Sequence, residues 1–363
     1  MEPKVLHVIA RMNVGGTARY VGELVENIPG SILATGNVQG SEIEDPCVRN
    51  LTTIRVPSLG RRIDPLNDYR AWVDLRRIIK REKPDIVHTH TFKAGLIGRL
   101  VSGSHKRVHT FHGHLFGDHS FSWIQMRFIT FIERVLAQRT DLLISVGDKV
   151  GIELRGAGIG PHRMWKSIPP GVDPLPKQEK EAARKLLGIK SDKLIFGWMA
   201  RVTKVKNPFL LIEIAKRLPY VNFVMAGGGD LLDSIRLSQL KNLQVLGWVD
   251  ASQFWAAVDC AISTSDNEGM PIALIEAQMG GIPVIASDVG SNSEVIKNGI
   301  SGFICKRDIN DFVIAISQVI ESDSLRISMG NAARIWAIEE FSTRKMIESH
   351  TSAYLSLSDR KIL

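Results

Sequence analysis

Two glutamates eight positions apart are the residues whose types and spacing most suggest chemistry. Glu268 falls in a polar, glycine-containing loop after an apolar strand at 260–263, and Glu276 falls in the apolar helix that follows. Pro271 fits the first turn of that helix, where its missing N–H costs no hydrogen bond. The free N–H groups and dipole of a helix N-terminus favour an anion beside Glu268. The pattern suits a nucleoside diphosphate sugar whose sugar meets Glu268 and whose ribose meets Glu276, although two solvated acids could have the same spacing.

Two basic residues supply a candidate clamp for a diphosphate. Arg201 and Lys206 come directly after an apolar strand expected at 194–199, beside the start of the next helix. A guanidinium fork with a nearby ammonium suits adjacent phosphates. A solvated basic loop could have the same sequence, so the basic pair predicts a diphosphate site only in combination with the two glutamates.

Glycines and a tryptophan follow two further strands. Gly227 begins a run of three glycines after the strand expected at 222–226, and such a run permits close backbone approach. Trp248 and Val249 end a strand that begins at Leu243, where a nucleobase could rest against backbone and an apolar wall. Gly227, Trp248 and Val249 are therefore candidates for donor binding, although a tryptophan at such a place more often only packs.

The elements that must hold these residues alternate along the whole chain. We expect strands at 5–10, 85–89, 108–111, 142–145, 194–199, 222–226, 243–246, 260–263 and 283–286, and helices at about 17–27 and 65–82. Strands separated by helices predict parallel βαβ units in doubly wound sheets. The proline- and glycine-rich piece at 168–176 predicts a linker between two α/β halves. Ligands of such sheets bind at the carboxyl ends of strands, so we expect the site in a cleft between the halves.

Length and composition fit this division. A chain of 363 residues exceeds one typical core, and 44% hydrophobic, 7% aromatic and 23% charged residues are ordinary globular composition. The sequence has no secretory signal and no run of about 18 uncharged apolar residues, so we expect a cytoplasmic protein without a membrane span. Cys47, Cys260 and Cys305 have neither disulfide nor zinc spacing, which indicates reduced thiols.

Charge is distributed unevenly. Residues 1–170 hold 24 Lys and Arg against 16 Asp and Glu, whereas residues 171–363 hold 22 of each, and nine of the ten histidines precede residue 170. Such asymmetry indicates different partners for the two halves. A basic first half could face anionic lipid, a phosphorylated acceptor or nucleic acid. A solvated, slightly basic surface is the alternative.

Taken together, these residues resemble the retaining GT-B glycosyltransferases, specifically glycosyltransferase family 4. The resemblance covers almost the whole chain and rests on Gly15-Gly16, residues 85–88, 112–114 and 170–173, Arg201 with Lys206, and the glutamate pair. It implies two Rossmann-like, doubly wound domains facing across a cleft. Residues 1–170 would bind the acceptor, residues 171–340 would bind the nucleotide sugar, and a C-terminal helix in 341–363 would pack back toward the first domain. Ala200 departs from the family, which usually has glycine there, but a methyl group should not abolish the site.

The resemblance also implies roles at the diphosphate. Arg201 and Lys206 would neutralise it, Glu276 would hold the ribose hydroxyls, and Gly15 and Gly16 would let the first loop close onto the donor phosphates. Transfer would proceed with retention, and the leaving diphosphate would help deprotonate the acceptor, so stabilising that leaving group is the main electrostatic task. The chain has no Asp-x-Asp. We therefore predict metal-independent transfer without a cofactor.

At the sugar, the resemblance implies that Glu268 and the amides of Gly269 and Met270 address the donor, and that His112 contacts the transferred sugar or the acceptor. Other histidines cluster with His112 in the sequence, at positions 88, 90, 109 and 114. A zinc site is the alternative interpretation, but the second half offers no partner residues at ligand spacing. For each of the other histidines, a hydrogen-bonded structural role is the better expectation.

An aromatic and basic segment at 115–129 has two interpretations. Its rings could rest at a bilayer interface, but such a stripe is more often part of a core, and we favour the core. With the basic first half, the segment nevertheless suggests a lipid-linked acceptor and peripheral association with the inner face of the cytoplasmic membrane.

The predicted function is transfer of a hexose or N-acetylhexosamine from a nucleotide-diphosphate sugar, preferably a UDP-sugar, to a hydroxyl acceptor such as a lipid-linked or cell-surface polysaccharide precursor. The expected partners are this donor, this acceptor and an anionic membrane surface, but not nucleic acid. The alternatives are a nucleotide-sugar 2-epimerase on the same fold, an NAD-dependent dehydrogenase and a non-enzymatic sugar-binding protein. The loop at Gly15-Gly16 lacks the full G-x-G-x-x-G spacing, which counts against the dehydrogenase.

Overall fold

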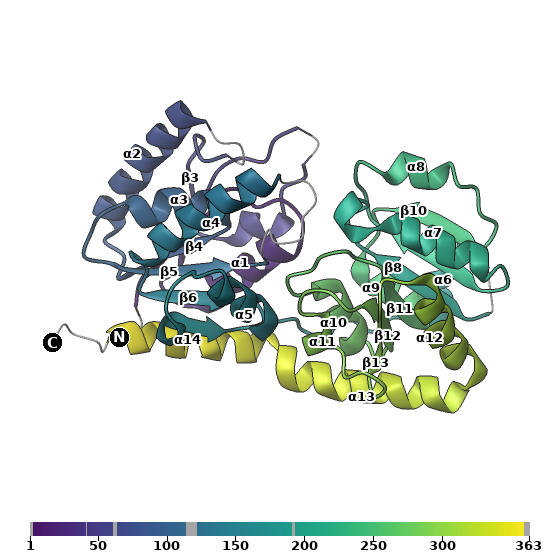
Figure 1. The fold of residues 1–363 in the computed structure, drawn as a ribbon. Coiled ribbons are helices and arrows are strands. Elements are labelled where there is room, and N and C mark those ends of the chain that lie inside the picture. Colours follow the sequence, from purple (N-terminus) through teal and green to yellow (C-terminus); the bar gives the residue numbers. More distant parts are fainter. Residues whose placement is uncertain (1–2, 41, 61–63, 114–121, 191–192, 359–363) are drawn as a thin grey trace. The chain divides into compact units, whose positions relative to one another are not determined.

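The computed structural model describes residues 3–40, 42–60, 64–113, 122–190 and 193–358, and the chain divides into two compact units. The first unit extends to Gly171 and includes the chain from Thr343 onward, whereas the second is Val172–Ser342. Each unit has its own sheet with helices packed around it (Figure 1). The prediction of two Rossmann-like α/β domains is confirmed.

The sheet of the first unit has seven parallel strands among the described residues, in the order β3-β2-β1-β4-β5-β6-β7. They are β1 (Val5–Ile9), β2 (Ile32–Thr35), β3 (Thr53–Arg55), β4 (Ile86–His90), β5 (Lys106–Phe111), β6 (Leu142–Ser145) and β7 (Trp165–Ser167). From β1 the chain builds outward to β3 and then returns to β4 on the other side. The carboxyl ends of β1 and β4 therefore form a switch point, where such sheets bind ligands.

Helices cover both faces of this sheet. They are α1 (Gly16–Asn27), α2 (Pro65–Glu82), α3 (Phe92–Leu100), α4 (Trp123–Ala137), α5 (Asp148–Gly156) and α14 (Thr343–Ser358), with 3-10 turns η1 (Pro46–Asn50) and η2 (His162–Met164). The bounds of α2 match the expected 65–82. The side chain of Asp64 accepts a hydrogen bond from the N–H of Asn67, Pro65 begins the helix, and Lys83 ends it in the left-handed conformation.

The second unit has six parallel strands among its described residues, in the order β10-β9-β8-β11-β12-β13. They are β8 (Ile195–Met199), β9 (Asn222–Ala226), β10 (Leu243–Gly247), β11 (Cys260–Ser263), β12 (Val284–Ser287) and β13 (Gly302–Cys305). The switch point lies between β8 and β11, which pair directly. The helices are α6 (Lys180–Leu186), α7 (Pro208–Arg217), α8 (Leu232–Arg236), α9 (Ala251–Ala257), α10 (Ile272–Met279), α11 (Asn292–Val295), α12 (Ile309–Glu321) and α13 (Asp323–Phe341), with the 3-10 turn η3 (Lys204–Lys206).

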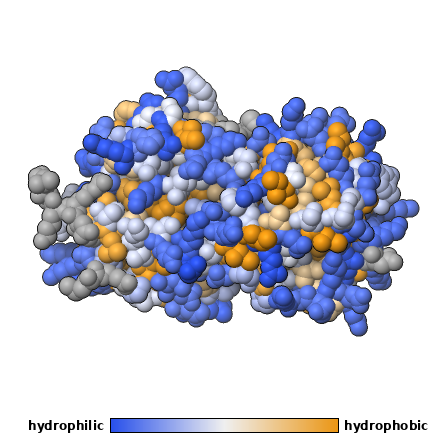
Figure 2. Space-filling view, turned by 90° about the horizontal axis from the view of Figure 1, so that it is seen from below, coloured by the Kyte–Doolittle hydropathy of each residue, from blue (hydrophilic) through white to orange (hydrophobic). Residues whose placement is uncertain are grey.

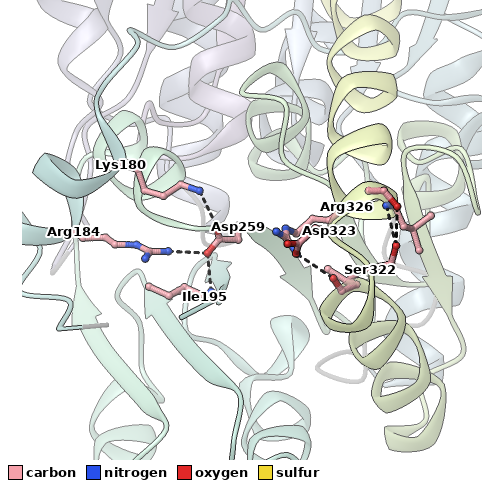
Figure 3. A network of polar contacts seen from close by, with 10 residues as sticks. Lys180, Arg184, Ile195, Asp259, Ser322, Asp323 and Arg326 are labelled. Carbon is pink, nitrogen blue, oxygen red and sulfur yellow. Dashed lines mark hydrogen bonds and ion pairs between the residues drawn. The ribbon is translucent and has the colours of Figure 1, made fainter. Parts of the chain in front are cut away.

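A charged network fixes the edge of this second sheet. Asp259, just before β11, accepts hydrogen bonds from Lys180 Nζ at 2.6 Å, Arg184 Nη2 at 2.7 Å and the N–H of Ile195 at 2.9 Å (Figure 3). The carboxylate thereby joins α6 to the beginnings of β8 and β11. Burying this carboxylate would be costly without such partners, so the network holds the two strands of the switch point in register.

The segment around α4 corrects one expectation. Within 115–129, residues 115–121 lie outside the described residues, and the rest belongs to α4 or to its N-cap Ser122. Trp123, Ile124 and Phe128 are 70%, 72% and 60% exposed, so the favoured core interpretation is wrong for them. The reason is that α4 turns its opposite side, which carries Glu133, Leu136 and Ala137, toward the interior.

On the face drawn in Figure 2, hydrophobic residues lie in separate groups among hydrophilic ones. None of the helices in the described ranges is both long enough and apolar enough to cross a membrane.

Candidate active site

The predicted donor residues of the second unit gather at its switch point. Arg201 and Lys206 follow β8, and Glu268 follows β11, so all three leave the carboxyl ends of adjacent parallel strands. Glu276 lies farther along, on α10. The sequence therefore placed this group correctly relative to the sheet.

Lys206 and Glu268 are in direct contact. Lys206 Nζ donates to Glu268 Oε1 at 2.6 Å, and the two side chains are 19% and 8% exposed. The hydroxyl of Ser265 donates to the same oxygen at 2.7 Å. A carboxylate so buried needs such partners, because an unpaired buried charge is costly. The contact unites two residues that lie 62 positions apart in the chain.

Asn207 connects the loops that carry this pair. Its backbone is left-handed, with φ of 46°, and its side chain caps α7 by accepting from the N–H of Leu210 at 3.2 Å. Its Nδ2 donates to Asp266 Oδ1 at 3.1 Å, and its carbonyl accepts from the hydroxyl of Thr264 at 2.9 Å. Non-glycine residues in this conformation carry strain and persist where their surroundings fix them. Asn207 is a site residue that the sequence reasoning missed, although its place before Pro208 was the available signal.

Arg201 has an exposed side chain and lies in the segment after β8 that also carries Lys206. Its loop is bonded to the loop that follows β9, since the N–H of Val202 donates to the carbonyl of Gly228 at 2.9 Å. Gly227 has φ of 128°, and a Cβ there would lie 1.9 Å from the carbonyl oxygen of Ala200. Only glycine fits, because the loops after β8 and β9 touch through their backbones. The methyl group of Ala200, the departure noted above, is accommodated against the core of the unit.

The walls of the site come from two further loops. Trp248 is 57% exposed, and its indole lies against Gly228, where an added Cβ would be 2.2 Å from Nε1. Val249 and Met270 are partly buried and both pack against a second core cluster of the unit, which includes Leu274 and Ile275. Trp248 and Val249 follow β10 and Met270 precedes α10, and the expectation that a nucleobase rests against Trp248 and Val249 stays a prediction.

The two glutamates are held differently. Glu276 is 5% exposed, and the indole N–H of Trp255 donates to its Oε2 at 3.3 Å. The backbone at Gly290 packs directly against the loop of Glu268. Gly290 has φ of 49°, and a Cβ there would lie 1.8 Å from the Glu268 carbonyl oxygen. The carbonyl of Gly269 accepts from the N–H of Ser291 at 3.2 Å, which fixes the same turn. Both carboxylates therefore have defined orientations.

In the first unit, Gly15 and Gly16 follow β1 and begin α1. Gly15 is the N-cap, and both glycines are exposed. The carbonyl of Gly15 accepts from the N–H of Arg19 at 3.1 Å. The loop therefore presents free backbone at the start of a helix, at the switch point of its own sheet, which is suitable for an anionic group.

His112 follows β5 and ends a chain of hydrogen-bonded imidazoles. Its Nε2 lies 3.1 Å from Nδ1 of His90, and Nε2 of His90 lies 3.2 Å from Nδ1 of His7. The ring of Tyr20 stands edge-on to His112, with centroids 4.8 Å apart. His112 is thus held by His90 on β4 and Tyr20 on α1, and His90 is in turn bonded to His7 on β1.

The same network reaches α14. The hydroxyl of Tyr354 lies 2.6 Å from Nδ1 of His88, and Nε2 of His88 lies 2.7 Å from the hydroxyl of Thr110. The hydroxyl of Tyr20 is 2.6 Å from Nε2 of His350. Tyr20, His350 and Tyr354 were not predicted from the sequence. The spacing of His350 and Tyr354, four residues apart on one helix face, was the available signal.

Burial keeps these histidines neutral. It lowers the pKa of His7 and of His112 to about 3, and it lowers the pKa of His88, His90 and His350 well below the usual value. For His88 and His90, neighbouring histidines act in the same direction. A charged imidazolium is disfavoured away from water.

Three of the rings could in principle share a metal ion. Candidate ligand atoms of His7, His88 and His90 lie within 4.8 Å of one another, and His7 was not among the histidines grouped in the sequence. However, both nitrogens of His88 already make short hydrogen bonds to hydroxyl groups. The geometry fits a hydrogen-bonded network better than a set of ligands.

Comparisons with known proteins agree with this architecture. Residues 14–174 match the family model described as Glycosyltransferase Family 4, and residues 179–336 match the model described as Glycosyl transferases group 1. The chain is 30% identical over 325 residues to UDP-Gal:alpha-D-GlcNAc-diphosphoundecaprenol alpha-1,3-galactosyltransferase of Escherichia coli, a match that covers 83% of each protein.

Solved structures show the same fold. Sucrose-phosphate synthase of Thermosynechococcus elongatus superposes with a TM-score of 0.83 at 17% identity, covering 98% of this chain and 99% of the other. Anabaena HepE in complex with UDP and glucose also gives 0.83, at 18% identity, covering 98% of this chain and 100% of the other.

Proposed function

Because the chain belongs to glycosyltransferase family 4, we propose that it moves a hexose or N-acetylhexosamine from a UDP-sugar to a lipid-linked acceptor with retention. Family membership itself makes the chain a glycosyltransferase that uses a nucleotide-sugar donor. UDP is proposed because the Escherichia coli relative is named for UDP-Gal and HepE was solved with UDP. The relative is also named for a diphosphoundecaprenol acceptor, which supports a lipid-linked one here.

The observation that carries the proposal is the contact between Lys206 and Glu268 at the switch point, where Arg201 also follows β8. Arg201 and Lys206 supply positive charge for the diphosphate that leaves. Both hydrogen bonds to Glu268 fall on Oε1, so Oε2 is the oxygen that would address the hydroxyls of the donor sugar. Charge-assisted hydrogen bonds of this kind are the strong ones.

The remaining donor contacts follow from the same loops. Glu276, oriented by Trp255, would hold the ribose hydroxyls. Trp248 and Val249 would border the base, and the amides of Gly269 and Met270 would face the sugar.

In the reaction we propose, the bond from the anomeric carbon to the phosphate oxygen breaks, and the acceptor oxygen bonds to the same face of that carbon. The acceptor proton passes to the departing phosphate, so no side chain forms a covalent intermediate. Arg201 and Lys206 stabilise the charge of the leaving group, which is the role a divalent cation would otherwise have. Turnover is therefore expected to be independent of added metal.

The first unit would receive the acceptor. His112 would contact the transferred sugar or the acceptor hydroxyl, and the loop at Gly15 and Gly16 would offer its N–H groups to phosphates. With an acceptor in lipid, the enzyme would work at the inner face of the cytoplasmic membrane.

Two substitutions test the site. Glu276→Gln should weaken UDP binding by about 10- to 150-fold, because a hydrogen bond to a charged group contributes about 1.5–3 kcal/mol. Arg201→Ala should lower kcat by about 100- to 1,000-fold at saturating donor, the usual effect of removing one group that stabilises developing charge. Calorimetry with UDP, GDP and ADP, followed by turnover with their sugars and a chelator, gives the measurements.

Lys204→Ala is the matched control, because Lys204 is exposed on the same loop and no role is assigned to it. It should leave both UDP affinity and kcat unchanged. Wild-type behaviour of Glu276→Gln and Arg201→Ala would refute the site assignment. Inversion at the anomeric carbon of the product, read by NMR, would refute retention alone.

A further inference from the structure

The outer side of α4 is an apolar stripe that nothing among the described residues covers. Ile124, Phe128, Phe131 and Val135 are 72%, 60%, 61% and 43% exposed. At about 100° per residue on an α-helix, these four positions fall within a sector of about 60°. Isolated exposed hydrophobic residues need no explanation, but a continuous stripe of four marks an interaction surface.

Positive charge borders the stripe. Arg127 and Arg134 fall together on one side of it, and Arg127 lies over the ring of Trp123 at 4.8 Å from the centroid. Arg139, just beyond the helix, is exposed as well. The one acidic residue of α4 is Glu133, which is buried and bonded to Arg99 at 2.7 Å. The exposed charge of α4 is therefore exclusively basic.

The position of α4 is fixed by a capping box at its start and by an ion pair on its inner side. The capping box of Ser122 and Gln125 satisfies its first N–H groups. On the inner side, the pair of Arg99 and Glu133 joins it to α3. The apolar side chains are thus displayed by a fixed helix of 15 residues, about 22 Å long, rather than exposed by a loose end.

We propose that this side of α4 binds an anionic lipid bilayer, with the helix lying in the plane of the interface. An apolar stripe bordered by arginines, with a tryptophan at the helix start and no exposed acid, is what a headgroup layer complements. Joining two copies of the chain through this side of α4 would bring like-charged arginines together, whereas anionic headgroups would neutralise them. Membrane binding itself does not depend on the proposed function, whereas its use to reach a lipid-linked acceptor rests on it.

Vesicle flotation tests the proposal with the whole protein. Vesicles of phosphatidylcholine with phosphatidylglycerol should float the protein at low salt, and pure phosphatidylcholine should float at least about tenfold less, since each arginine near an anionic surface contributes about fivefold. Phe128→Ser with Phe131→Ser should reduce binding at least tenfold, and Arg127→Gln with Arg139→Gln should remove most of the dependence on phosphatidylglycerol. Ile335→Ser with Arg334→Gln is the matched control, because Ile335 is 60% exposed on α13 beside an exposed arginine.

The variants should keep the thermal midpoint and the UDP response of the wild type, which separates loss of binding from loss of folding. Equal flotation of wild type and the double serine variant would overturn the proposal. So would a change of oligomeric state in light scattering without a change in flotation, because the surface would then join copies of the chain. Retained flotation in a protein that binds no UDP would refute the proposed function and leave the membrane surface standing.

Discussion

Replacing Lys206 by methionine tests whether the contact with Glu268 is a true buried ion pair. Methionine keeps most of the side chain's length and removes the charge. Glu268, 8% exposed, would keep only the hydrogen bond from Ser265. The carboxylate would then be a buried charge with one neutral donor, and the unit should lose stability for that reason.

The size of the loss follows from the exposure of the two groups. Removing one partner of a fully buried pair costs about 3–5 kcal/mol. The side chain of Lys206 is 19% exposed, so water can partly replace it, and we expect about 2–3 kcal/mol. For a domain of about 150–250 residues this corresponds to a fall in Tm of about 4–12 °C.

A double-mutant cycle measures the pair itself. Lys206→Met, Glu268→Gln and the double variant are unfolded by denaturant without nucleotide. We expect the double variant to lose about 1–2 kcal/mol less than the sum of the single variants, because it buries no unpaired charge. Lys216→Met is the control, since Lys216 pairs with Glu213 at 2.7 Å with both side chains about half exposed, and it should change the free energy of unfolding by less than about 1 kcal/mol.

Additivity would refute the reasoning. If the losses of the two single variants summed to that of the double variant within about 0.5 kcal/mol, Lys206 and Glu268 would not interact in the free protein. The placement of the donor site would then rest on Arg201 and Glu276 alone.

Two other predictions concern stability. The pKa of His7 in the folded protein is about 3, below the usual 6.5, so between these pH values the unfolded state binds a proton that the folded state does not. The contribution of His7 to stability should therefore be fully present above pH 6.5 and fall as the pH approaches 3. At pH 5 the free energy of unfolding should be lower by about 2 kcal/mol through His7. Denaturant unfolding at pH 7.5 and pH 5 measures this, and a His7→Asn variant should show a shallower dependence. Gly227→Ala should lower the free energy of unfolding by at least about 2 kcal/mol, because the added Cβ would lie 1.9 Å from the carbonyl oxygen of Ala200. Gly156→Ala is the control and should be nearly neutral, because the space around Gly156 is open. A neutral Gly227→Ala would contradict the close approach of the two loops.

The sequence was informative where apolar runs were long. The expected strand bounds at 142–145, 222–226 and 260–263 match those observed. The strands missed were β2, β3, β7 and β13, each of three or four residues. Such short runs give too few residues for a period to be recognised, and pairing with neighbouring strands, rather than local preference, makes them strands.

The site shows the same division. The positions of Arg201, Lys206 and Glu268 after β8 and β11 followed from the alternation of strands and helices. Their mutual contact did not, because it depends on the strand order, which places β11 beside β8. The exposed side of α4 was missed for a related reason: aromatic side chains predict burial on average, and only the packed structure tells which side of a helix faces the interior.

The buried histidines bear on where the acceptor's proton goes. A general base works best when its pKa lies near the working pH. Burial lowers the pKa of His112 to about 3, and its neighbour His90 is shifted in the same direction, so neither ring is suited to remove a proton from a hydroxyl near neutrality. The bond from His90 to Nε2 instead fixes the orientation of His112 as a neutral hydrogen-bonding group. A neutral, oriented His112 is suited to position a sugar or acceptor rather than to take its proton, which agrees with the proposed mechanism, in which the departing phosphate would accept that proton.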